Sequence, residues 1–347
     1  MNIAFICNTL NGGGAERFTA NISNRFSEES RNTVYVITGK KADNDYSVNS
    51  EVIRLNFLTK NLLIDVKQIL NCSKRYNFDV IVGIDIYPNF CVCLCRLFSN
   101  VRCIISERNA PKQVNISSKS RFLRWVLYRF ADGYVFQTNG AKKFYSKRIQ
   151  RKSVVIHNPI RENLPVKSNV NNNEIVAVGR LNEQKNYPML IKAFSIVHRK
   201  HSDYKLRIFG EGKLKETLVS LAQELNISDY VFFEGFTLNV HDSIKDSSIF
   251  VMTSDFEGMP NALMEAMAMG FPVVSTDCPS GGPGELIQDG VNGMLCHVGD
   301  YEECEQKICE IITNSKLKNE LSEKAKEIIF THSADQIFLK WKEFLQK

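Results

Sequence analysis

The sequence lacks an apolar run long enough to cross a membrane. A membrane-spanning helix needs about 20 predominantly apolar residues, and Asp85 and Arg96 interrupt the longest candidate. The pattern of a secretory signal peptide is also missing, because Met1-Asn2 leads directly into the strand-like IAFIC without a basic flank or a cleavage site. The expected location is therefore the cytoplasm, where thiols stay reduced.

Metal-binding patterns are scarce as well. The chain has ten cysteines, but Cys91, Cys93 and Cys95 alternate in a short apolar segment without the second Cys or His pair of a zinc site. They are predicted to be buried thiols. The one Asp-x-Asp pair, Asp43 and Asp45, lies in a polar stretch and is interpreted as solvated. No bound metal is expected.

Two nucleotide-binding signatures are absent, namely the spaced Gly-rich fingerprint of dinucleotide folds and the Gly-Lys-Ser/Thr phosphate loop. Instead, Gly12, Gly13 and Gly14 stand together after the first strand-like segment. Glycines there let the backbone approach a ligand, and a helix starting near Ala15 presents free N–H groups to an anion or a sugar oxygen. A plain tight turn remains the alternative.

What the chain does have is an ordinary soluble composition and a regular alternation of strand-like and helix-like segments. Its 347 residues, 44% of them hydrophobic, suit two domains of roughly 150 residues each. Alternation of this kind predicts parallel strands with crossover helices. The predicted strands cover residues 2–7, 33–38, 79–84, 102–106 and 133–138, then 175–180, 204–210, 230–235, 248–253 and 272–276.

The predicted fold class is therefore α/β, with two doubly wound Rossmann-like domains facing a central cleft. The boundaries are placed at 1–160 for the first domain, 161–174 for a polar, Asn-rich linker and 175–330 for the second domain. Residues 331–347 are expected to form a C-terminal helix, whose Trp341 and Phe344 can pack back on the first domain. Ligands of such sheets bind at the carboxyl ends of the strands, so the cleft is the expected active site.

Charge is distributed unevenly along the chain. The first 163 residues hold 25 Lys and Arg against 12 Asp and Glu, whereas the remainder holds 19 against 26. The stretch 112–152 contains eleven basic residues and one acid, with RFLRWVLYRF at its centre. A basic amphipathic stretch indicates a surface for anionic lipid head groups, and a packed helix with solvated arginines is the alternative. Nucleic acid is not an expected partner, because no known nucleic-acid module is present and the other half is acidic.

The stretch FEGMPNALMEAMAMG contains a carboxylate in apolar company. Pro260 suits the first turn of a helix, which would run to about Gly270 and be buried between layers because apolar residues surround it. Within it stands Glu265. An ionised carboxylate in such a place needs a partner.

Two cations are expected near the same place. Arg180 and Lys185 stand just after the first strand of the second domain, before the helix that begins near Pro188. Two cations at that strand end would neutralise a diphosphate and stabilise it as a leaving group. Alternatively, they are ordinary surface residues of a loop.

Taken together, VGRLNEQKN and EGMPNALMEAMAMGFPVVSTDCPSGGPGELIQDGVNGML resemble the nucleotide-sugar glycosyltransferases of family four, which have the GT-B fold. The likeness includes the Glu-x7-Glu pair at Glu257 and Glu265, the Gly-Arg-Leu with its following lysine, and GGAER in the first domain. More narrowly, GGGAER, ISERNAP and STDCPSGGPGELI are similar to bacterial enzymes that assemble surface polysaccharides and lipid-linked oligosaccharides.

The resemblance implies roles for individual residues on the donor side. Glu265 would accept hydrogen bonds from the ribose hydroxyls, Glu257 would hold a hydroxyl of the transferred sugar, and Arg180 and Lys185 would clamp the diphosphate. The turn would contact sugar oxygens or phosphate, with Pro260 shaping it; its residues are Gly258, Met259, Pro260, Asn261 and Ala262. The base would lie near Gly210, Gly212 and Phe236.

On the acceptor side, the resemblance implies a loop made by Gly12, Gly13, Gly14 and Glu16. Many relatives have a histidine near the reacting sugar, but this chain has none before His157, and SERNAP stands in the corresponding region. Glu107, Arg108 and Asn109 are the polar groups there. On a retaining front-face route the departing phosphate can take the proton of the acceptor, so Glu107 is a candidate for positioning and not for the base.

The leading hypothesis is a retaining, metal-independent transferase that needs no cofactor. It would move a hexose or N-acetylhexosamine from a nucleotide diphosphate, expected to be UDP, to a glycan acceptor, lipid-linked, in polysaccharide, O-antigen or capsule biosynthesis. A peripheral position on an anionic inner membrane face accords with the basic first domain. A sugar-nucleotide 2-epimerase of the same fold and a non-catalytic glycan-assembly scaffold are the alternatives.

Overall fold

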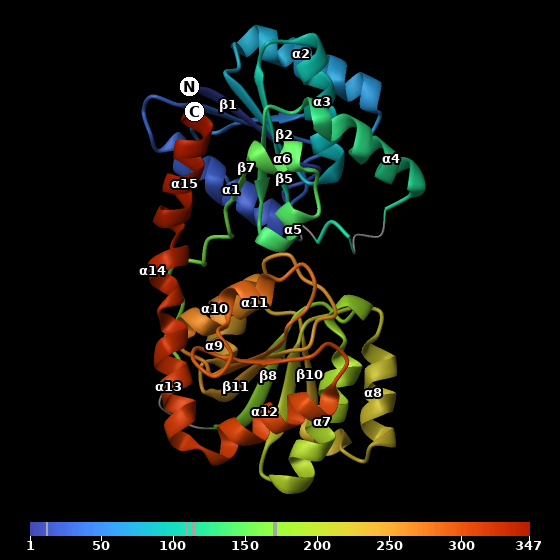
Figure 1. Cartoon of the computed structure of the whole chain (residues 1–347), viewed down its shortest axis with the longest axis vertical. Coiled ribbons are helices and arrows are strands. Elements are labelled where there is room, and N and C mark those ends of the chain that lie inside the picture. The colour runs from blue at the N-terminus through green and yellow to red at the C-terminus, as the bar shows by residue number, and fades with distance from the viewer. Residues whose placement is uncertain (12, 109, 113–115, 169–171) are drawn as a thin grey trace. The chain divides into compact units, whose positions relative to one another are not determined.

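The computed structural model describes residues 1–11, 13–108, 110–112, 116–168 and 172–347 (Figure 1). The chain divides into two compact units. Unit 1 comprises residues 1–158 together with 337–347, and unit 2 comprises residues 159–336. Each unit is built on one parallel sheet with helices on both faces, which confirms the predicted α/β class and its doubly wound sheets.

Unit 1 contains a seven-stranded sheet in the order β3-β2-β1-β4-β5-β6-β7. Every neighbouring pair is parallel. The chain turns from one half of the sheet to the other between β1 and β4, which is the switch point of a doubly wound fold. The strands are β1 (Asn2–Ile6), β2 (Thr33–Thr38), β3 (Ile53–Asn56), β4 (Val80–Ile84), β5 (Arg102–Glu107), β6 (Gly133–Phe136) and β7 (Ser153–Val155).

Helices cover both faces of this sheet. One apolar cluster joins the strands to α2 and α3, and another joins them to α1 and α15. The indole of Trp341 in α15 is fully buried, with its ring centroid 5.4 Å from that of Phe18 in α1. The helices are α1 (Gly14–Ser27), α2 (Leu62–Tyr76), α3 (Ile86–Phe98), α4 (Ser118–Leu127), η1 (Tyr128–Phe130), α5 (Asn139–Lys143), α6 (Lys147–Arg151) and α15 (Ala334–Gln346).

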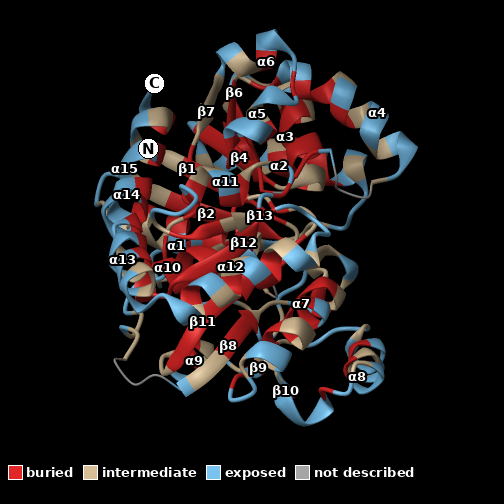
Figure 2. Cartoon of the chain, turned by 60° about the horizontal axis from the view of Figure 1, so that its bottom comes forward, coloured by how far each residue is buried: buried red, intermediate tan, exposed pale blue. Residues whose placement is uncertain are grey.

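Unit 2 contains a six-stranded parallel sheet in the order β10-β9-β8-β11-β12-β13. Its central strand β11 has a fully buried pattern because helices cover both of its faces. Figure 2 shows this as red central strands beneath helices whose outer surfaces are pale blue. The strands are β8 (Asn172–Val178), β9 (Lys205–Phe209), β10 (Val231–Gly235), β11 (Ser247–Met252), β12 (Val273–Thr276) and β13 (Met294–Cys296).

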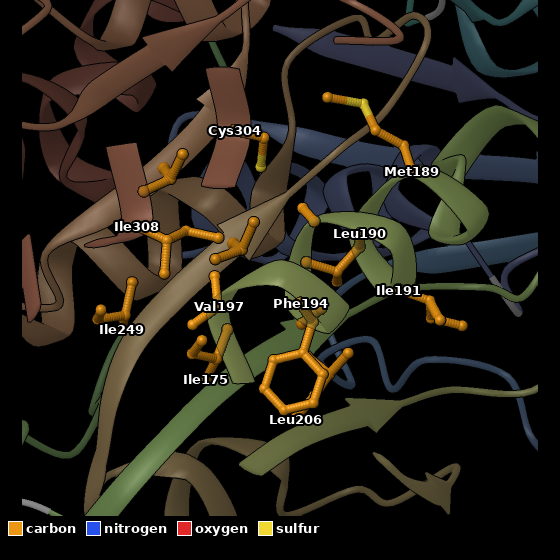
Figure 3. Packing of buried hydrophobic residues seen from close by; sticks show 14 of the residues in the cluster. Ile175, Met189, Leu190, Ile191, Phe194, Val197, Leu206, Ile249, Cys304 and Ile308 are labelled. Carbon is orange, nitrogen blue, oxygen red and sulfur yellow. The ribbon is translucent and has the colours of Figure 1, made fainter. Parts of the chain in front are cut away.

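Two apolar clusters hold this sheet between its helices. In the larger one, Phe194 and Val197 of α7 pack with Ile308 of α12 over the strands (Figure 3). The other cluster joins the opposite face to α9, α10 and α11. The helices are η2 (Glu183–Lys185), α7 (Tyr187–Lys200), α8 (Lys215–Glu224), η3 (Ser228–Tyr230), α9 (Val240–Ile244), α10 (Asn261–Met269), α11 (Gly282–Leu286), α12 (Tyr301–Thr313), α13 (Ser315–Lys326) and α14 (Ile328–His332).

Some sequence predictions change in detail. The short strands β3, β7 and β13 were not predicted, and β8 begins at Asn172, inside the segment 161–174 expected to be a linker. The prediction for Cys91, Cys93 and Cys95 is confirmed, because all three thiols are buried in α3. Within the described residues, no helix is both long and apolar enough to span a membrane.

Candidate functional site

The loop between β11 and α10 in unit 2 contains the first acid of the Glu-x7-Glu pair. Glu257 is 7% exposed, and its Oε1 lies 2.6 Å from Nζ of Lys185. The hydroxyl of Ser254 donates to the same oxygen over 2.8 Å. The structure thus pairs two charges that the sequence analysis had assigned separately, one to the sugar and one to the diphosphate.

Hydrogen bonds hold this loop against the segment between β8 and α7. The backbone N–H of Asp255 donates to the carbonyl of Gln184 (2.8 Å), and the side-chain amide of Gln184 donates to the carbonyl of Phe256 (3.0 Å). Asn186 caps α7 with a left-handed backbone, φ 43°, and its amide donates to Asp255 over 2.7 Å. The contact between Lys185 and Glu257 is therefore made by two loops that fix each other.

The two cations expected beside this loop have different surroundings. Lys185 is partly buried, and its side-chain stem passes Gly179, where an added Cβ would lie 2.9 Å from Cε of the lysine. Arg180 is exposed, and its guanidinium forms no ion pair or hydrogen bond with other described residues. The structure thus pairs Lys185 with Glu257 and leaves the side chain of Arg180 exposed.

The second acid of the pair, Glu265, lies in the buried helix α10. The helix is buried as predicted and ends at Met269, with Gly270 as its C-cap, whose φ of 91° favours glycine. It begins at Asn261, so Pro260 is the N-cap and not the first helical residue, and its carbonyl accepts from the N–H of Met264. Oε2 of Glu265 lies 3.0 Å from Nε2 of His241 in α9.

The sequence analysis did not predict His241 as a partner of Glu265. It expected the carboxylate to be satisfied by the ribose hydroxyls of a bound nucleotide. Both side chains are about nine-tenths buried, with relative exposures of 10% for the imidazole and 9% for the carboxylate. The two residues stand 24 positions apart, on different helices, so no periodic pattern connects them. This hydrogen bond fixes one oxygen of a carboxylate that was expected to bind ribose.

The turn at the start of α10 packs tightly on the loop after β12. An ideal Cβ on Gly282 would lie 1.8 Å from the carbonyl oxygen of Gly258, so only glycine fits there. The N–H of Glu257 donates to the carbonyl of Pro279 over 3.0 Å. Nearby, burial and the charge of Glu257 raise the pKa of the Cys278 thiol to about 12, so this thiol stays protonated.

The glycines expected near the nucleotide base have a structural role as well. An added Cβ on Gly210 would lie 2.0 Å from the carbonyl oxygen of Gly179, and one on Gly212 would lie 2.2 Å from that of Leu181. Both glycines therefore allow the loops after β8 and β9 to touch through their backbones. Phe236, after β10, is 68% exposed and presents a free aromatic face.

In unit 1, the glycine-rich loop forms the N-terminus of α1. Gly13 is the N-cap and Gly14 the first residue of α1, while Gly12 and the other expected acceptor residue, Asn109, lie outside the described residues. Glu16 is the third helical residue. An added Cβ on Gly13 would lie 2.3 Å from Oε2 of Glu16. A glutamate here suits the positive end of the helix dipole. The carboxylate of Glu16 thus lies beside the N-cap residue of α1.

Glu107, at the end of β5, is 1% exposed. It accepts hydrogen bonds from Arg124 Nη1 over 3.3 Å and from the hydroxyl of Tyr145. Burial raises the pKa of Glu107 to about 7, against the opposing effects of Arg124 and Tyr145. This carboxyl group is enclosed by protein and connects the end of β5 to Arg124 of α4 and to Tyr145.

The expectation that the Asp-x-Asp pair is solvated was wrong for Asp45. Asp45 is not solvated, because its side chain is only 5% exposed and forms an ion pair with Arg54 at 2.5 Å. Asn11 donates to the other oxygen of the carboxylate over 3.1 Å. Among the described residues there is no group of three or more His, Cys, Asp or Glu placed to hold a metal ion.

Comparisons with known proteins agree with the geometry of both units. Residues 160–328 match the family described as Glycosyl transferases group 1, and residues 12–164 match Glycosyltransferase Family 4. A Campylobacter jejuni N-acetylgalactosamine-N,N'-diacetylbacillosaminyl-diphospho-undecaprenol 4-alpha-N-acetylgalactosaminyltransferase is 31% identical over 253 residues, covering 69% of this chain and 68% of the relative. The chain belongs to glycosyltransferase family 4.

Two further comparisons extend over the whole glycosyltransferase. A second Campylobacter jejuni enzyme, named as an alpha-1,4-N-acetyl-D-galactosaminyltransferase acting on a diNAcBac-PP-undecaprenol-linked glycan, is 25% identical over 342 residues, covering 94% of this chain and 93% of that enzyme. The crystal structure of Anabaena HepE in complex with UDP superposes with a TM-score of 0.85 and 18% identity, covering all of both chains. The fold is therefore GT-B, and the chain is a retaining glycosyltransferase.

Proposed function

We propose that this glycosyltransferase transfers a hexose or N-acetylhexosamine from a UDP-sugar to a glycan acceptor carried on a lipid diphosphate. The observation that carries the proposal is the contact between Lys185 and Glu257 at the carboxyl ends of β8 and β11. UDP is favoured because the similar HepE was crystallised with it. A lipid-linked acceptor is favoured by the names of the two Campylobacter relatives.

The proposed donor site uses the residues of unit 2 in distinct ways. Glu265 binds the ribose hydroxyls with its carboxylate fixed by His241, and Glu257 binds a hydroxyl of the sugar. Lys185 and Arg180 bind the diphosphate. Before the donor arrives, Lys185 and Glu257 neutralise each other, which avoids an uncompensated buried charge. Donor binding then replaces this contact with one from the lysine to phosphate and one from the carboxylate to sugar.

The proposed chemistry depends on charge that develops on the leaving diphosphate. Cations that contact the leaving oxygens stabilise the transition state more than the bound substrate. The proton of the acceptor hydroxyl passes to the departing phosphate, so a carboxylate base is not required. Glu107 is buried against Arg124 and Tyr145, which agrees with a supporting role. Activity is expected without a metal ion.

We also propose that unit 1 binds an anionic membrane surface, where a lipid-linked acceptor is anchored. Phe122 and Trp125 of α4 are each 63% exposed, and their rings lie 6.2 Å apart. The guanidinium of Arg129 lies 4.0 Å from the ring of Trp125. Exposed aromatic and basic side chains on one face of a helix are typical of helices that lie in the membrane interface.

The test is a donor screen with the purified chain. UDP-glucose, UDP-galactose, their N-acetyl forms and a GDP-sugar are incubated with and without a lipid-diphosphate-linked glycan, with and without EDTA, and UDP release is measured. Release from a UDP-sugar that rises with acceptor and survives EDTA is the expected result. Conversion of the sugar nucleotide without UDP release would favour an epimerase, and neither reaction with any donor would favour a scaffold.

A further inference from the structure

A buried arginine in unit 1 has hydrogen-bonding capacity that the protein does not use. Arg108 directly follows β5 and is 7% exposed. Its guanidinium stacks on the ring of Phe18 in α1, with the central carbon 3.7 Å from the ring centroid. The plane of the guanidinium is therefore held in place by the aromatic face, while its N–H groups remain directed sideways.

The described neighbours of Arg108 accept hydrogen bonds from only one of its three donor nitrogens. Nη2 donates to the side-chain oxygen of Asn158, which also accepts from Nε2 of Gln137 over 2.6 Å. Nε and Nη1 of Arg108 have no hydrogen-bond partner among the described residues, and neither does Oε1 of Gln137. Buried polar atoms are rarely left in this state, since each costs free energy of about 1–3 kcal/mol.

These groups lie where the topology of the sheet predicts a ligand. Phe18 belongs to the helix after β1, and Arg108, Gln137 and Asn158 follow β5, β6 and β7. All these strands are parallel, so their carboxyl ends share one edge of the sheet. The edge includes the switch point between β1 and β4, where doubly wound sheets bind ligands.

The electrostatics of this position favour an anion. Burial lowers the pKa of Arg108 to about 9, with Asp85 acting in the opposite direction. The charged form is therefore incompletely compensated by the protein. A group with negatively charged oxygens would supply acceptors for Nε and Nη1 of Arg108 and the missing charge together.

We propose that Arg108 is a phosphate-binding residue of unit 1, whose Nε and Nη1 groups donate to oxygens of the acceptor's diphosphate. The proposal deepens the proposed function and rests on it for the identity of the acceptor. Nε and Nη1 lie on different edges of the guanidinium, with Nη2 between them, so they would donate to separate oxygens of the diphosphate. The same chemistry would suit the diphosphate of the donor, so the experiment has to separate these two sources.

The binding experiment uses the full chain saturated with UDP, so that the donor site is filled, and calorimetric titration with inorganic pyrophosphate. Wild-type protein should bind pyrophosphate, and Arg108→Gln should weaken that binding about tenfold or more, because hydrogen bonds to a charged group are lost. Arg108→Lys retains the charge but places its donors on a single nitrogen, and it should fall between them. Arg151→Gln, which changes an exposed arginine of α6, is the matched control and should bind as wild type.

Two results would overturn the proposal. One is equal pyrophosphate affinity of UDP-saturated wild type and Arg108→Gln, and the other is wild-type binding that UDP abolishes, which would place the anion at the donor site. If Arg108→Gln does not fold, the same comparison is made with Arg108→Lys, which retains the cation beside Phe18.

The kinetic experiment distinguishes failure of this proposal from failure of the proposed function. Arg108→Gln should raise KM for a lipid-diphosphate acceptor about tenfold and leave UDP affinity and acceptor-independent hydrolysis of the UDP-sugar unchanged. A purely structural role would instead change all three. If wild type binds no UDP but binds pyrophosphate through Arg108, the proposed function fails and the assignment of Arg108 stands.

Discussion

At the scale of single residues, the contact between Lys185 and Glu257 gives the first prediction. Lys185→Ala removes a cation that is expected to compensate charge on the leaving diphosphate. We expect kcat with a UDP-sugar to fall by a factor that corresponds to about 2–4 kcal/mol of transition-state stabilisation, while UDP still binds. Steady-state kinetics and UDP titration measure the two effects separately.

The matched control is Lys200→Ala. It breaks another ion pair, with Glu305 at 2.8 Å, at the C-terminal end of α7, whereas Lys185 precedes the N-terminus of that helix. Its kinetics should equal those of wild type. Unchanged kcat in Lys185→Ala would remove Lys185 from the proposed donor site.

The hydrogen bond between His241 and Glu265 gives the second prediction. Glu265→Ala should weaken UDP binding by about 1.5–3 kcal/mol, as expected when hydrogen bonds to a charged group are lost. His241→Ala should weaken it less, because the carboxylate remains but loses its fixed orientation. Calorimetry with UDP on both single variants and the double variant gives the coupling between them. Strictly additive losses would show that His241 does not act through Glu265.

Residue by residue, the sequence predicted the chemical types in the site better than their contacts. A carboxylate in an apolar helix signals that a partner exists, but it does not say which residue supplies it. His241 approaches Glu265 only because α9 and α10 pack in the same cluster. Asp45 was predicted to be solvated because its polar neighbours suggest a loop, whereas Arg54 of β3 encloses it.

At the scale of elements, the close packing of Gly282 against Gly258 gives the third prediction. A Cβ on Gly282 would lie 1.8 Å from a backbone oxygen, so Gly282→Ala must displace the turn at the start of α10. We expect UDP affinity to fall about tenfold or more and the melting temperature to fall as well.

Gly290→Ala serves as its control. Gly290 has a φ of 73° and no atom within 4 Å of the added Cβ, so this variant costs backbone strain of about 1 kcal/mol or more without displacing a neighbour. It should lower the melting temperature and retain UDP affinity. Equal losses of UDP affinity in the two variants would contradict the role given to Gly282.

The network around Glu107 gives the fourth prediction, which concerns pH. Its carboxyl group joins β5 to α4 through Arg124 and to Tyr145, and burial raises its pKa from 4.5 to about 7. The folded protein therefore holds this proton more tightly than the unfolded chain does. The stabilisation is complete below about pH 4.5 and is lost as pH rises through about 7.

Glu107→Gln has no such proton to release. The free energy of unfolding of wild type minus that of the variant should therefore decrease between about pH 5 and about pH 8 and then level off. Urea unfolding of both proteins across this range measures the difference. A difference that is constant or increases with pH would mean that Glu107 is ionised throughout.

Among the elements, the sequence predicted the long buried strands and the amphipathic helices but not the short edge strands. The apolar runs of β1, β4 and β11 reflect sheets covered on both faces. The strands β7 and β13 have three residues each, too few for any repeating pattern, and they form because a neighbouring strand supplies partners. Helix α10 begins at Asn261, one residue later than predicted, because Pro260 is equally compatible with an extended N-cap conformation.

At the scale of the whole molecule, the basic first part of the chain gives the fifth prediction. Co-sedimentation with vesicles should rise with the fraction of anionic lipid and fall at high salt, because exposed charges are screened over about 8 Å at physiological ionic strength. Changing Lys142, Lys143, Lys147 and Arg148 to Gln should weaken vesicle binding. This loss should grow with the fraction of anionic lipid. Phe122→Ser with Trp125→Ser should weaken it at high salt too, because their contribution is apolar.

The negative result is equally clear for this surface. If purified protein does not co-sediment with anionic vesicles at low salt, the excess of basic residues does not serve lipid binding. The membrane proposal would then be withdrawn, and the donor site in unit 2, which shares none of these residues, would be unaffected.

The position of α15 in the core of unit 1 has a consequence for biosynthesis. Ile337, Trp341 and Leu345 are buried in the cluster that contains Phe18, and Arg102 donates to the carbonyl of Leu345 across 243 positions of sequence. All seven strands of unit 1 thus leave the ribosome well before α15, which shares the cover of one face of the sheet with α1. Until α15 has been synthesised, the part of this apolar face that α15 covers beside α1 stays exposed in the nascent unit, and chaperones that hold apolar surface can bind it during that interval.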